Sequence, residues 1–453
     1  MDGNNNTVNT SQPMLMDDVP MNHFHKKMTA LTWGAHFVDG YSIGSISMAL
    51  TVMAAQTNMS PVWQGLIGSS ALIGLFFGSS IMGKVADIYG RQKIFTLNFI
   101  IITLASLLQL FVSGAPSLFI LRVIIGFFLG SDYTVCFTLL SEIAPRKQRG
   151  DLLGFLSAIW TIGYCLSTVI GFVIEKYYPS AWNWVLASTF VPAIIMLIAR
   201  LGTPESPRWL VKVGRTEEAQ AIVDKYIGKG VIVEEAPPEK EVGYRLLFSK
   251  KYRKQTWFGA LFFVCNVIPY FAVYTFLPTI LMNLGIKASF TTDLALNILL
   301  VVGGFVGLWC TMKLTRRGFS IGGFLICGVA LLAVSVIPAS LTPIIIASFV
   351  VFTVAISALS NLSGVFPPEV LPTEVRSSGV GFAVAMSRVG SAAATFMLPI
   401  MMSGIGMRLS LIILDAVLFV GALICWAWAP ETKGLSLTSA VTEGVERDAK
   451  DAK

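Results

Sequence analysis

A few charged side chains stand inside stretches of this sequence that are otherwise apolar. The clearest cases are Asp39 in AHFVDGYSIG, Arg122 and Asp132 in LRVIIGFFLGSDY, and Arg388 in AMSRVG. A charge at the centre of a membrane helix costs about 2.5–3.5 kcal/mol on insertion scales, so such a residue needs a partner or a task. These residues are therefore the first candidates for chemistry.

We expect Asp39 and Arg122 to form a pair. Burial disfavours the charged form of a carboxyl group, and a guanidinium beside it favours that form. If Arg122 contacts Asp39 in one conformation and leaves it in another, Asp39 alternately releases and binds a proton. Asp132 is a second candidate for the proton site, and a static structural pair is the plain alternative. His36 lies three positions before Asp39 and is a candidate for tuning this proton site. A lone histidine in an apolar run is more often a hydrogen-bonding residue of the core.

Composition indicates the solvent that this chain meets. Of 453 residues, 54% are hydrophobic and 13% are charged, against roughly 25% charged in a soluble domain. Apolar stretches of about 20 residues recur, each long enough to cross a hydrocarbon layer of about 30 Å. The sequence predicts an all-α membrane protein with twelve transmembrane helices, near residues 28–53, 62–85, 94–112, 117–141, 152–174, 182–201, 256–283, 289–313, 320–338, 342–364, 377–403 and 407–428.

The loops between these helices differ in charge. Loops that follow even-numbered helices are basic, whereas those after odd-numbered helices carry only Lys176, Lys287 and Arg408 as basic residues. Basic loops face the cytoplasm in most membrane proteins. We therefore predict an integral protein of the plasma membrane with both termini inside, a disordered tail at 1–25 and a second tail at 431–453.

Two six-helix halves are predicted, at 26–203 and 256–430. The loop between them, 204–255, contains the amphipathic segment GRTEEAQAIVDKY and the linker-like VEEAPPEKE. Glu142 and Arg149 recur 227 positions later as Glu369 and Arg376. Gly90 recurs 228 positions later as Gly318, and Pro204 recurs 226 positions later as Pro430. Such a repeat indicates two parallel bundles related by an axis along the membrane normal, with a binding site between them near the midplane.

The same offsets match individual residues of the two halves. At an offset of 227 positions, Asp39 corresponds to Asn266. We therefore expect proton chemistry in the first half and expect Asn266 to be free to bind substrate. At 228, Asp87 corresponds to Thr315, so the second copy of any contact made by Asp87 is expected to be weaker.

The loop motifs resemble those of a known family. GKVADIYGRQK resembles the loop signature G-x-x-x-D-x-x-G-R-[RK] of the major facilitator superfamily, and EIAPRKQRG, PESPRWLVKVGR and PETKG are similar to its sugar-porter-type signatures. The resemblance runs from about residue 27 to 435 and implies the major facilitator fold and transport by alternating access. It also implies gating ion pairs that bridge the halves; helix caps and topological anchors are the alternative. The gating candidates are Asp87, Arg91, Glu142, Arg149, Glu205, Arg208, Glu369 and Arg376.

Arg388 is the main clue to the cargo. An arginine is always charged and binds a carboxylate with two parallel hydrogen bonds. The chain resembles aromatic acid:proton symporters and organic anion transporters in carrying an arginine in its eleventh helix. A guanidinium paired with a neighbouring acid or carbonyl is the alternative. Further candidates for substrate contact, for each of which plain packing is the alternative, are Asn266, Tyr270, Tyr274, Trp160 and Tyr164.

Together these features predict a proton-coupled symporter that imports a small organic anion, such as an aromatic or other monocarboxylate. The alternatives are a sugar or polyol symporter, a drug-efflux antiporter and a sensor without turnover. The seventh helix, FFVCNVIPYFAVYTF, lacks the glutamines typical of sugar porters. The six cysteines fall in apolar runs without CxxC spacing, and nothing resembles a P-loop, a metal cluster or a catalytic triad. We therefore expect no enzymatic activity, no metal or other cofactor, no nucleic-acid partner, and a monomer in the lipid bilayer.

Overall fold

The computed structural model describes residues 14–233, 244–284, 290–371 and 375–432. Within them, twelve helical segments are long and apolar enough to cross a membrane, which confirms the predicted fold class. The first six are α1 (His23–Thr57), α2 (Pro61–Tyr89), α3 (Arg91–Leu108), α4 (Ala115–Ile143), α5 (Arg149–Tyr177), and α6 (Trp182–Ala187) continued by α7 (Phe190–Arg200). The second six are α10 (Arg253–Thr275) continued by α11 (Leu277–Asn283), α12 (Phe290–Lys313), α13 (Arg316–Val336), α14 (Thr342–Val370), α15 (Arg376–Gly404) and α16 (Met407–Trp428).

Two spans that the sequence predicts as single helices are broken. Span seven breaks at Phe276, and Pro278 opens α11 at a first-turn position where its missing N–H group costs nothing. Span six breaks at Ser188 and Thr189, where the hydroxyl group of Ser188 is bonded to that of Tyr41 at 2.9 Å. Apolar periodicity continues through both breaks, so the pattern alone did not reveal them.

Glycines bring the helices of the first half close together. A Cβ atom added at Gly40 of α1 would overlap the Trp160 carbonyl oxygen of α5, and one at Gly163 would overlap the Phe37 carbonyl oxygen. The pair α2 and α4 meets in the same way, because a Cβ at Gly126 would overlap the Ala71 carbonyl oxygen. Small residues allow such close approach of helices in membranes. This packing fixes α1 and α4, which carry most of the buried charges, against their neighbours.

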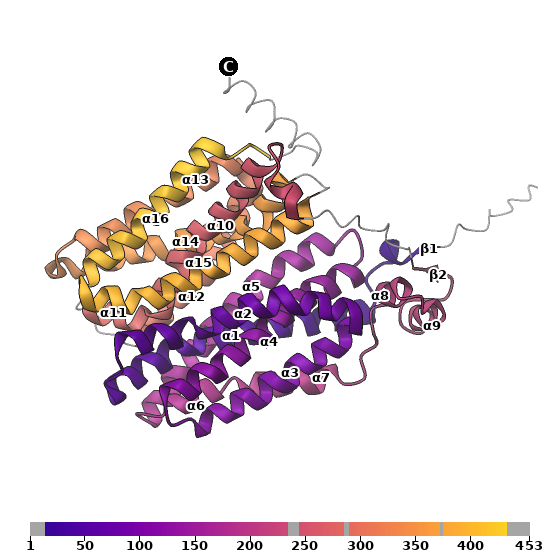
Figure 1. The fold of residues 1–453 in the computed structure, drawn as a ribbon, viewed down its shortest axis with the longest axis horizontal. Coiled ribbons are helices and arrows are strands. Elements are labelled where there is room, and N and C mark those ends of the chain that lie inside the picture. Colours follow the sequence, from indigo (N-terminus) through magenta and orange to yellow (C-terminus); the bar gives the residue numbers. More distant parts are fainter. Residues whose placement is uncertain (1–13, 234–243, 285–289, 372–374, 433–453) are drawn as a thin grey trace, which may run out of the picture.

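The two halves form separate bundles, indigo to magenta and orange to yellow in Figure 1. Their helices lie closest at the end of the molecule where α11 lies and spread apart toward the end that carries α8 (Pro207–Lys212) and α9 (Thr216–Tyr226) (Figure 1). We call the α8 and α9 end the basic end, because the basic loops lie there, and the other the opposite end. At the opposite end, the Thr51 hydroxyl group of α1 lies 3.3 Å from that of Thr279 in α11.

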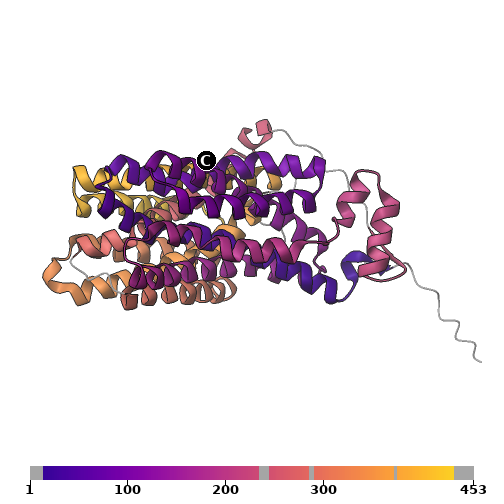
Figure 2. The ribbon, with the colours of Figure 1, turned by 90° about the horizontal axis from the view of Figure 1, so that it is seen from below.

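The N-terminal segment corrects one expectation. Residues 1–13 lie outside the described residues, but residues 14–25 are ordered. The strand β1 (Met14–Leu15) pairs in parallel with β2 (Val231–Ile232), which follows α9, and η1 (Met16–Asp18) leads into α1. Both strands lie beside α8 and α9 (Figure 1), and this part of the chain projects beyond one end of the bundles in the second view (Figure 2). Met16 and Val19 are buried against Val223, Val231 and Val233, so this polar-looking segment is held by its few apolar residues.

The loop between the halves matches its prediction in part. The amphipathic segment forms α9, with Ala219 and Val223 buried on one face. The linker-like segment at 234–243 lies outside the described residues, and the chain returns through η3 (Tyr244–Phe248) to α10.

Candidate functional site

Asp39 lies in the middle of α1 and is buried, with 2% of its surface exposed. Neither oxygen of its carboxyl group has a hydrogen-bond partner among the residues that the structure describes. Nδ1 of His36, one turn away on α1, lies 4.0 Å from Oδ2 of Asp39. A buried carboxyl group without partners is costly as an anion and is a natural place for a proton.

Arg122 does not pair with Asp39 in this structure, and their contact in another conformation stays a prediction. Its Nη1 donates to the main-chain oxygen of Ser42 at 3.0 Å, one turn of α1 beyond Asp39. Its Nε and Nη2 have no partner within the described part of the chain, and the side chain is fully buried. The guanidinium therefore lies one helical turn from the carboxyl group that it was expected to contact.

Asp132 has a partner that the sequence did not suggest. Arg200, the last residue of α7, lies with Nη1 3.5 Å from Asp132 Oδ1, and both side chains are fully buried. Arg200 also donates to the carbonyl oxygens of Phe95 at 3.0 Å and of Leu31 at 3.5 Å, and its guanidinium lies against the rings of Phe95 and Phe99. The other carboxyl oxygen of Asp132 accepts from Cys136 Sγ at 3.3 Å.

Arg388 reaches from α15 of the second half toward the first half. Its guanidinium carbon lies 5.5 Å from the ring centre of Tyr133 in α4 and 5.9 Å from that of Phe271 in α10. Tyr133 stacks on His36 with 5.2 Å between ring centres, and His36 is the neighbour of Asp39. The Nε atom of Arg388 is buried and unpartnered within the described residues. Arg388 and Asp39 thus face the same group of rings from different halves.

The predicted aromatic residues come together beside Arg388. Trp160 and Tyr164 of α5 stack at 5.6 Å, Trp160 meets Phe271 edge-on at 6.2 Å, and Tyr270 lies 5.3 Å from Tyr274. The Tyr164 hydroxyl group donates to the Tyr274 main-chain oxygen at 3.1 Å, which joins the halves, and Tyr274 donates to Thr353 at 2.8 Å.

Asn266 lies deeper in α10. Its amide nitrogen donates to the hydroxyl groups of Ser363 at 2.8 Å and Ser360 at 3.3 Å. Its amide oxygen is buried and has no partner among the described residues. One face of this side chain is therefore used by α14, and one acceptor is left for a ligand.

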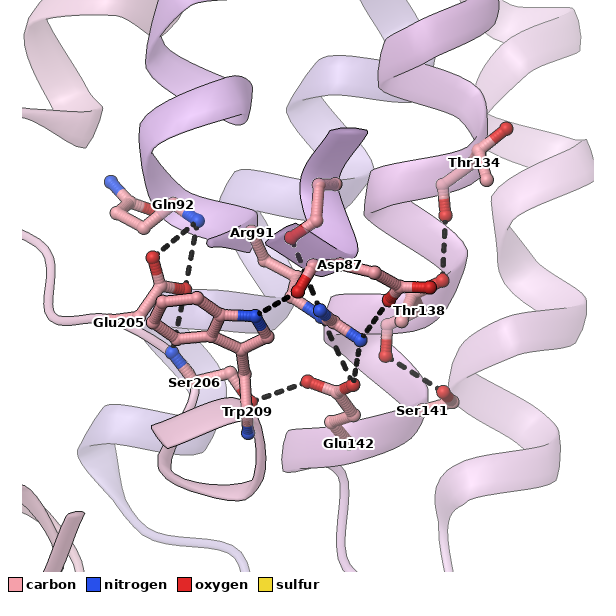
Figure 3. Close-up of polar contacts among 11 residues, drawn as sticks. Asp87, Arg91, Gln92, Thr134, Thr138, Ser141, Glu142, Glu205, Ser206 and Trp209 are labelled. Carbon is pink, nitrogen blue, oxygen red and sulfur yellow. Dashed lines mark hydrogen bonds and ion pairs between the residues drawn. The ribbon is translucent and has the colours of Figure 1, made fainter. Parts of the chain in front are cut away.

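The charged motifs at the basic end of the first half form one network (Figure 3). Arg91 pairs with Asp87 at 2.7 Å and with Glu142 at 3.1 Å. Glu205 accepts from the main-chain N–H of Gln92 at 2.9 Å, in the first turn of α3, where a carboxylate is favoured by the helix dipole. Ser206 donates to the other oxygen of Glu142. The network joins α2, α3, α4 and the segment after α7.

The second half repeats this network contact by contact. Arg316 donates to Glu369 at 3.1 Å and 3.2 Å, as Arg91 does to Glu142. Glu431 accepts from the main-chain N–H of Arg317 at 3.2 Å, as Glu205 does from Gln92, and Thr432 donates to Glu369 at 2.6 Å, as Ser206 does to Glu142. The contacts correct the register of the repeat, because Arg316 matches Arg91 at an offset of 225. Asp87 therefore corresponds to the exposed Met312 and not to Thr315.

The gating candidates pair within the halves in this structure, and their expected bridging of the halves when the cytoplasmic gate is shut stays a prediction. Each of these ion pairs joins residues of the same half, so they hold each bundle together at its basic end and do not bridge the halves. Arg149 and Arg376 each donate from Nε to a main-chain oxygen five residues back, Ala144 and Leu371, at 3.1 Å. Arg149 and Arg208 also pair with Asp17 of the N-terminal segment, at 2.7 Å for Arg149.

Several residues of the site escaped the sequence analysis. Arg200 ends a span and looks like one more basic residue of a loop, and Tyr133 directly follows the charged Asp132. Asp17 lies in a segment that was expected to be disordered. Glu431 stands in the PETKG motif and Arg316 in the loop between the eighth and ninth spans, but the register that was used placed Arg316 one residue after the match to Asp87.

Comparison with known proteins gives the same fold and a broad activity. The family model described as "Sugar (and other) transporter" matches residues 27–443. The chain is 46% identical over 438 residues to the Escherichia coli inner membrane metabolite transport protein YgcS, covering 96% of this chain and 98% of that protein. It is 24% identical to the niacin transporter NiaP of Acinetobacter baylyi, covering 94% and 98% of the two chains.

Solved structures with the same fold include the inward-open conformation of the Escherichia coli xylose transporter XylE. That structure superposes with a TM-score of 0.79 and 19% sequence identity, over 92% of this chain and 99% of XylE.

Proposed function

The chain belongs to the sugar (and other) transporter family, a family of membrane-embedded metabolite transporters, and from that premise we propose that it is a proton-coupled symporter importing a small organic anion. The observation that carries this proposal is the pair of buried, unsatisfied groups at the centre: the Asp39 carboxyl group from the first half and Arg388 Nε from the second. One is suited to a proton and the other to a carboxylate.

The cargo that fits this surface best is an aromatic monocarboxylate. Arg388 offers a free N–H group to a carboxylate, and the rings of Tyr133 and Phe271 lie within 6 Å of its guanidinium carbon, where they favour a flat, apolar body. Trp160 extends this wall beyond Phe271. The relative named as a niacin transporter supports this class, because niacin is a pyridine ring that bears one carboxylate.

We assign proton binding to Asp39, and we assign to Arg122 the task of displacing the proton from Asp39. Arg122 donates to the main chain one turn from Asp39, so a shift of one helical turn, about 5.4 Å, brings the two together. In the present arrangement Asp39 is free of Arg122 and holds a proton. Asp132 remains the second candidate, with Arg200 in the place of Arg122.

The proposed access cycle starts from a state open toward the basic end. The halves are joined at the opposite end through Thr51 and Thr279, and the ion pairs at the basic end lie within each half. By the positive-inside rule, the basic end lies on the cytoplasmic side of the plasma membrane, and both termini lie inside. We assign to the gating candidates the task of keeping each bundle rigid while the halves rock, in a transporter that works as a monomer.

Uptake into proteoliposomes tests this function. With an acidic exterior, radiolabelled benzoate or nicotinate should accumulate, with competition by other aromatic carboxylates and none by glucose or xylose. Competition by sugars alone would establish the sugar or polyol symporter instead. Accumulation of a cationic dye by energised inside-out vesicles would establish a drug-efflux antiporter, and saturable binding without flux would establish a sensor.

A matched pair of arginine variants locates the site. Arg388→Ala should raise the Kd for benzoate by about 10- to 100-fold, because a hydrogen bond to a charged group contributes about 1.5–3 kcal/mol. Arg408→Ala, at the exposed start of α16, is the control and should leave the Kd unchanged. Equal Kd values for Arg388→Ala and the unmodified protein would remove Arg388 from the site.

A further inference from the structure

Four buried charged groups surround the centre of the molecule, and their charges balance. The two acids are Asp39 and Asp132, and the two guanidinium groups are Arg200 and Arg388. Asp132, Arg200 and Arg388 all act electrostatically on Asp39. A fifth buried group, Arg122, donates to the main chain of α1.

Two of the four groups form a fixed pair. Asp132 and Arg200 are bonded to each other, and each has further partners in the first half: Cys136 for the acid, and the Phe95 and Leu31 carbonyl oxygens for the guanidinium. All five residues belong to one bundle, so this pair moves with that bundle as a unit. It contributes no net charge, and of the Arg200 guanidinium only Nε is left without a partner within the described residues.

The other two groups are free to change partners. Asp39 makes no hydrogen bond among the described residues, and Arg388 has an open Nε. They belong to different halves and are separated by two rings, Tyr133 and His36. Among the described residues, Asp39 pairs with no arginine and Arg388 with no acid, whereas Asp132 and Arg200 pair with each other.

Among the described residues near Asp39, Arg122 is the one further group that supplies a charge. On its own helix, His36 is stacked on Tyr133 and meets Phe137 edge-on, and neither of its ring nitrogens has a partner within the described residues. On α4, the titratable neighbours besides Asp132 are Tyr133 and Cys136, which are neutral as phenol and thiol. On α5, the contact next to Asp39 is the main chain of Trp160 against Gly40.

We infer that each carboxylate bound by Arg388 is accompanied by one proton on Asp39, so that the loaded transporter carries no net charge. The inference rests on the proposed function and adds to it a stoichiometry of one proton per monocarboxylate and an electroneutral cycle. A substrate carboxylate that occupies Arg388 leaves Asp39 without a counter-charge in a buried place, which costs several kcal/mol for an ion. A proton from the external solution that binds one Asp39 oxygen removes that charge, and it leaves again when the carboxylate departs.

Arg122 defines the competing outcome. Its Nε and Nη2 are unpartnered within the described residues, so this guanidinium is a second possible counter-charge for an entering anion. If Arg122 and not a proton balances the anion, the loaded transporter carries one negative charge, and uptake then depends on the membrane potential.

Uptake at clamped membrane potential separates the two outcomes. Proteoliposomes with a fixed pH difference are set by potassium and valinomycin to 0 mV or to 100 mV negative inside, and benzoate accumulation is measured after subtraction of that in protein-free liposomes, which neutral benzoic acid enters by diffusion. The unmodified protein should give the same accumulation ratio at both potentials, within about twofold. A ratio lowered by about 50-fold, the equivalent of one charge moved across 100 mV, overturns the inference.

The variant Asp39→Asn sharpens the test, because asparagine imitates the protonated acid. Its benzoate accumulation should no longer follow the pH difference and should become sensitive to potential, with about 50-fold less accumulation at 100 mV negative inside. Asp415→Asn, a buried acid in α16 of the second half, is the matched control and should remain insensitive to potential. If Asp39→Asn does not assemble, the measurement on the unmodified protein still decides.

The failures of the two ideas look different. Absence of any carboxylate uptake refutes the proposed function and this inference with it. Uptake that follows the pH difference but also changes by about 50-fold with potential leaves the symporter in place and refutes the electroneutral cycle alone.

Discussion

The buried pair of Asp132 and Arg200 offers a quantitative test of how the first half is held together. Replacing Arg200 with methionine keeps the length of the side chain and removes its charge. Asp132 then retains Cys136 Sγ as its side-chain donor at 3.3 Å, in a place without exposure to solvent. Removing one partner of a buried ion pair costs about 3–5 kcal/mol, because the other charge is left uncompensated.

The geometry places the expected cost at the lower end of that range. The Nη1–Oδ1 distance of 3.5 Å is long for an ion pair, and the closer contact of Arg200 is the Phe95 carbonyl oxygen at 3.0 Å. We therefore expect Arg200→Met to lower the free energy of unfolding by about 3 kcal/mol. The double variant Arg200→Met/Asp132→Asn should recover most of this loss, since replacing both members of a buried pair is often close to neutral.

A double-mutant cycle measures this coupling. Unfolding of the purified protein in mixed micelles is followed as SDS is added, for the two single variants, the double variant and Arg408→Met as an exposed control expected to change stability by less than about 0.5 kcal/mol. Additive effects of the two single variants, within about 0.5 kcal/mol, would refute the pairing. The double variant also tests the role of Asp132, because uptake driven by a pH difference should survive in it if Asp39 carries the proton.

Four further changes test other parts of the structure. Glu142→Gln and Glu369→Gln remove equivalent acids of the two repeated networks, so both should slow transport by a similar factor with less than a twofold change in the Kd for benzoate; an effect of only one of them, measured by uptake kinetics, would contradict equivalent roles. Asp17→Asn should release the N-terminal segment from Arg149 and Arg208 at a cost of about 1–3 kcal/mol and speed proteinase K cleavage before α1 while α1–α5 stay protected; an unchanged cleavage rate would show that the apolar contacts of Met16 hold the segment without it. Gly126→Ala should destabilise the first half by about 1–3 kcal/mol through overlap with Ala71 in thermal melts, whereas Gly322→Ala, with open space around it, should not.

The number and limits of the spans followed from the sequence because each depends on a local property, the length of an apolar run between polar loops. The repeat also followed, since equivalent loops keep the same residue types at nearly the same offset. The register at Arg316 was wrong by three residues, because Gly318 was matched to Gly90. The equivalent contacts are those of the arginines, since Arg91 donates to Glu142 as Arg316 does to Glu369. Contacts, and not residue letters, define equivalence here.

The site was only partly predictable for a different reason. Asp39, Arg388 and the aromatic residues were recognisable as polar or ring side chains in apolar runs, and the structure brings them to one place. Which charges pair depends on side-chain reach across helices separated by many residues: Arg200 reaches Asp132 over 68 positions, and Arg122 stops at the Ser42 main chain, 80 positions away. A pattern of single residues does not contain these distances.

The contrast between the basic end and the centre bears on how such a molecule couples two ligands. At the basic end, the two halves carry the same contacts, down to a hydroxyl group, Ser206 or Thr432, on the acid that holds the arginine. At the centre the halves differ, because Asp39 has no acidic counterpart and the matching position is Asn266. The repeated networks let each half move as a rigid body. Because the unpaired acid lies in one half and the unpaired guanidinium in the other, the distance between these two groups changes when the halves move. On the proposed mechanism, neither half alone binds both the proton and the anion. The two are coupled because the charge of the anion bound in one half is balanced by the proton bound in the other.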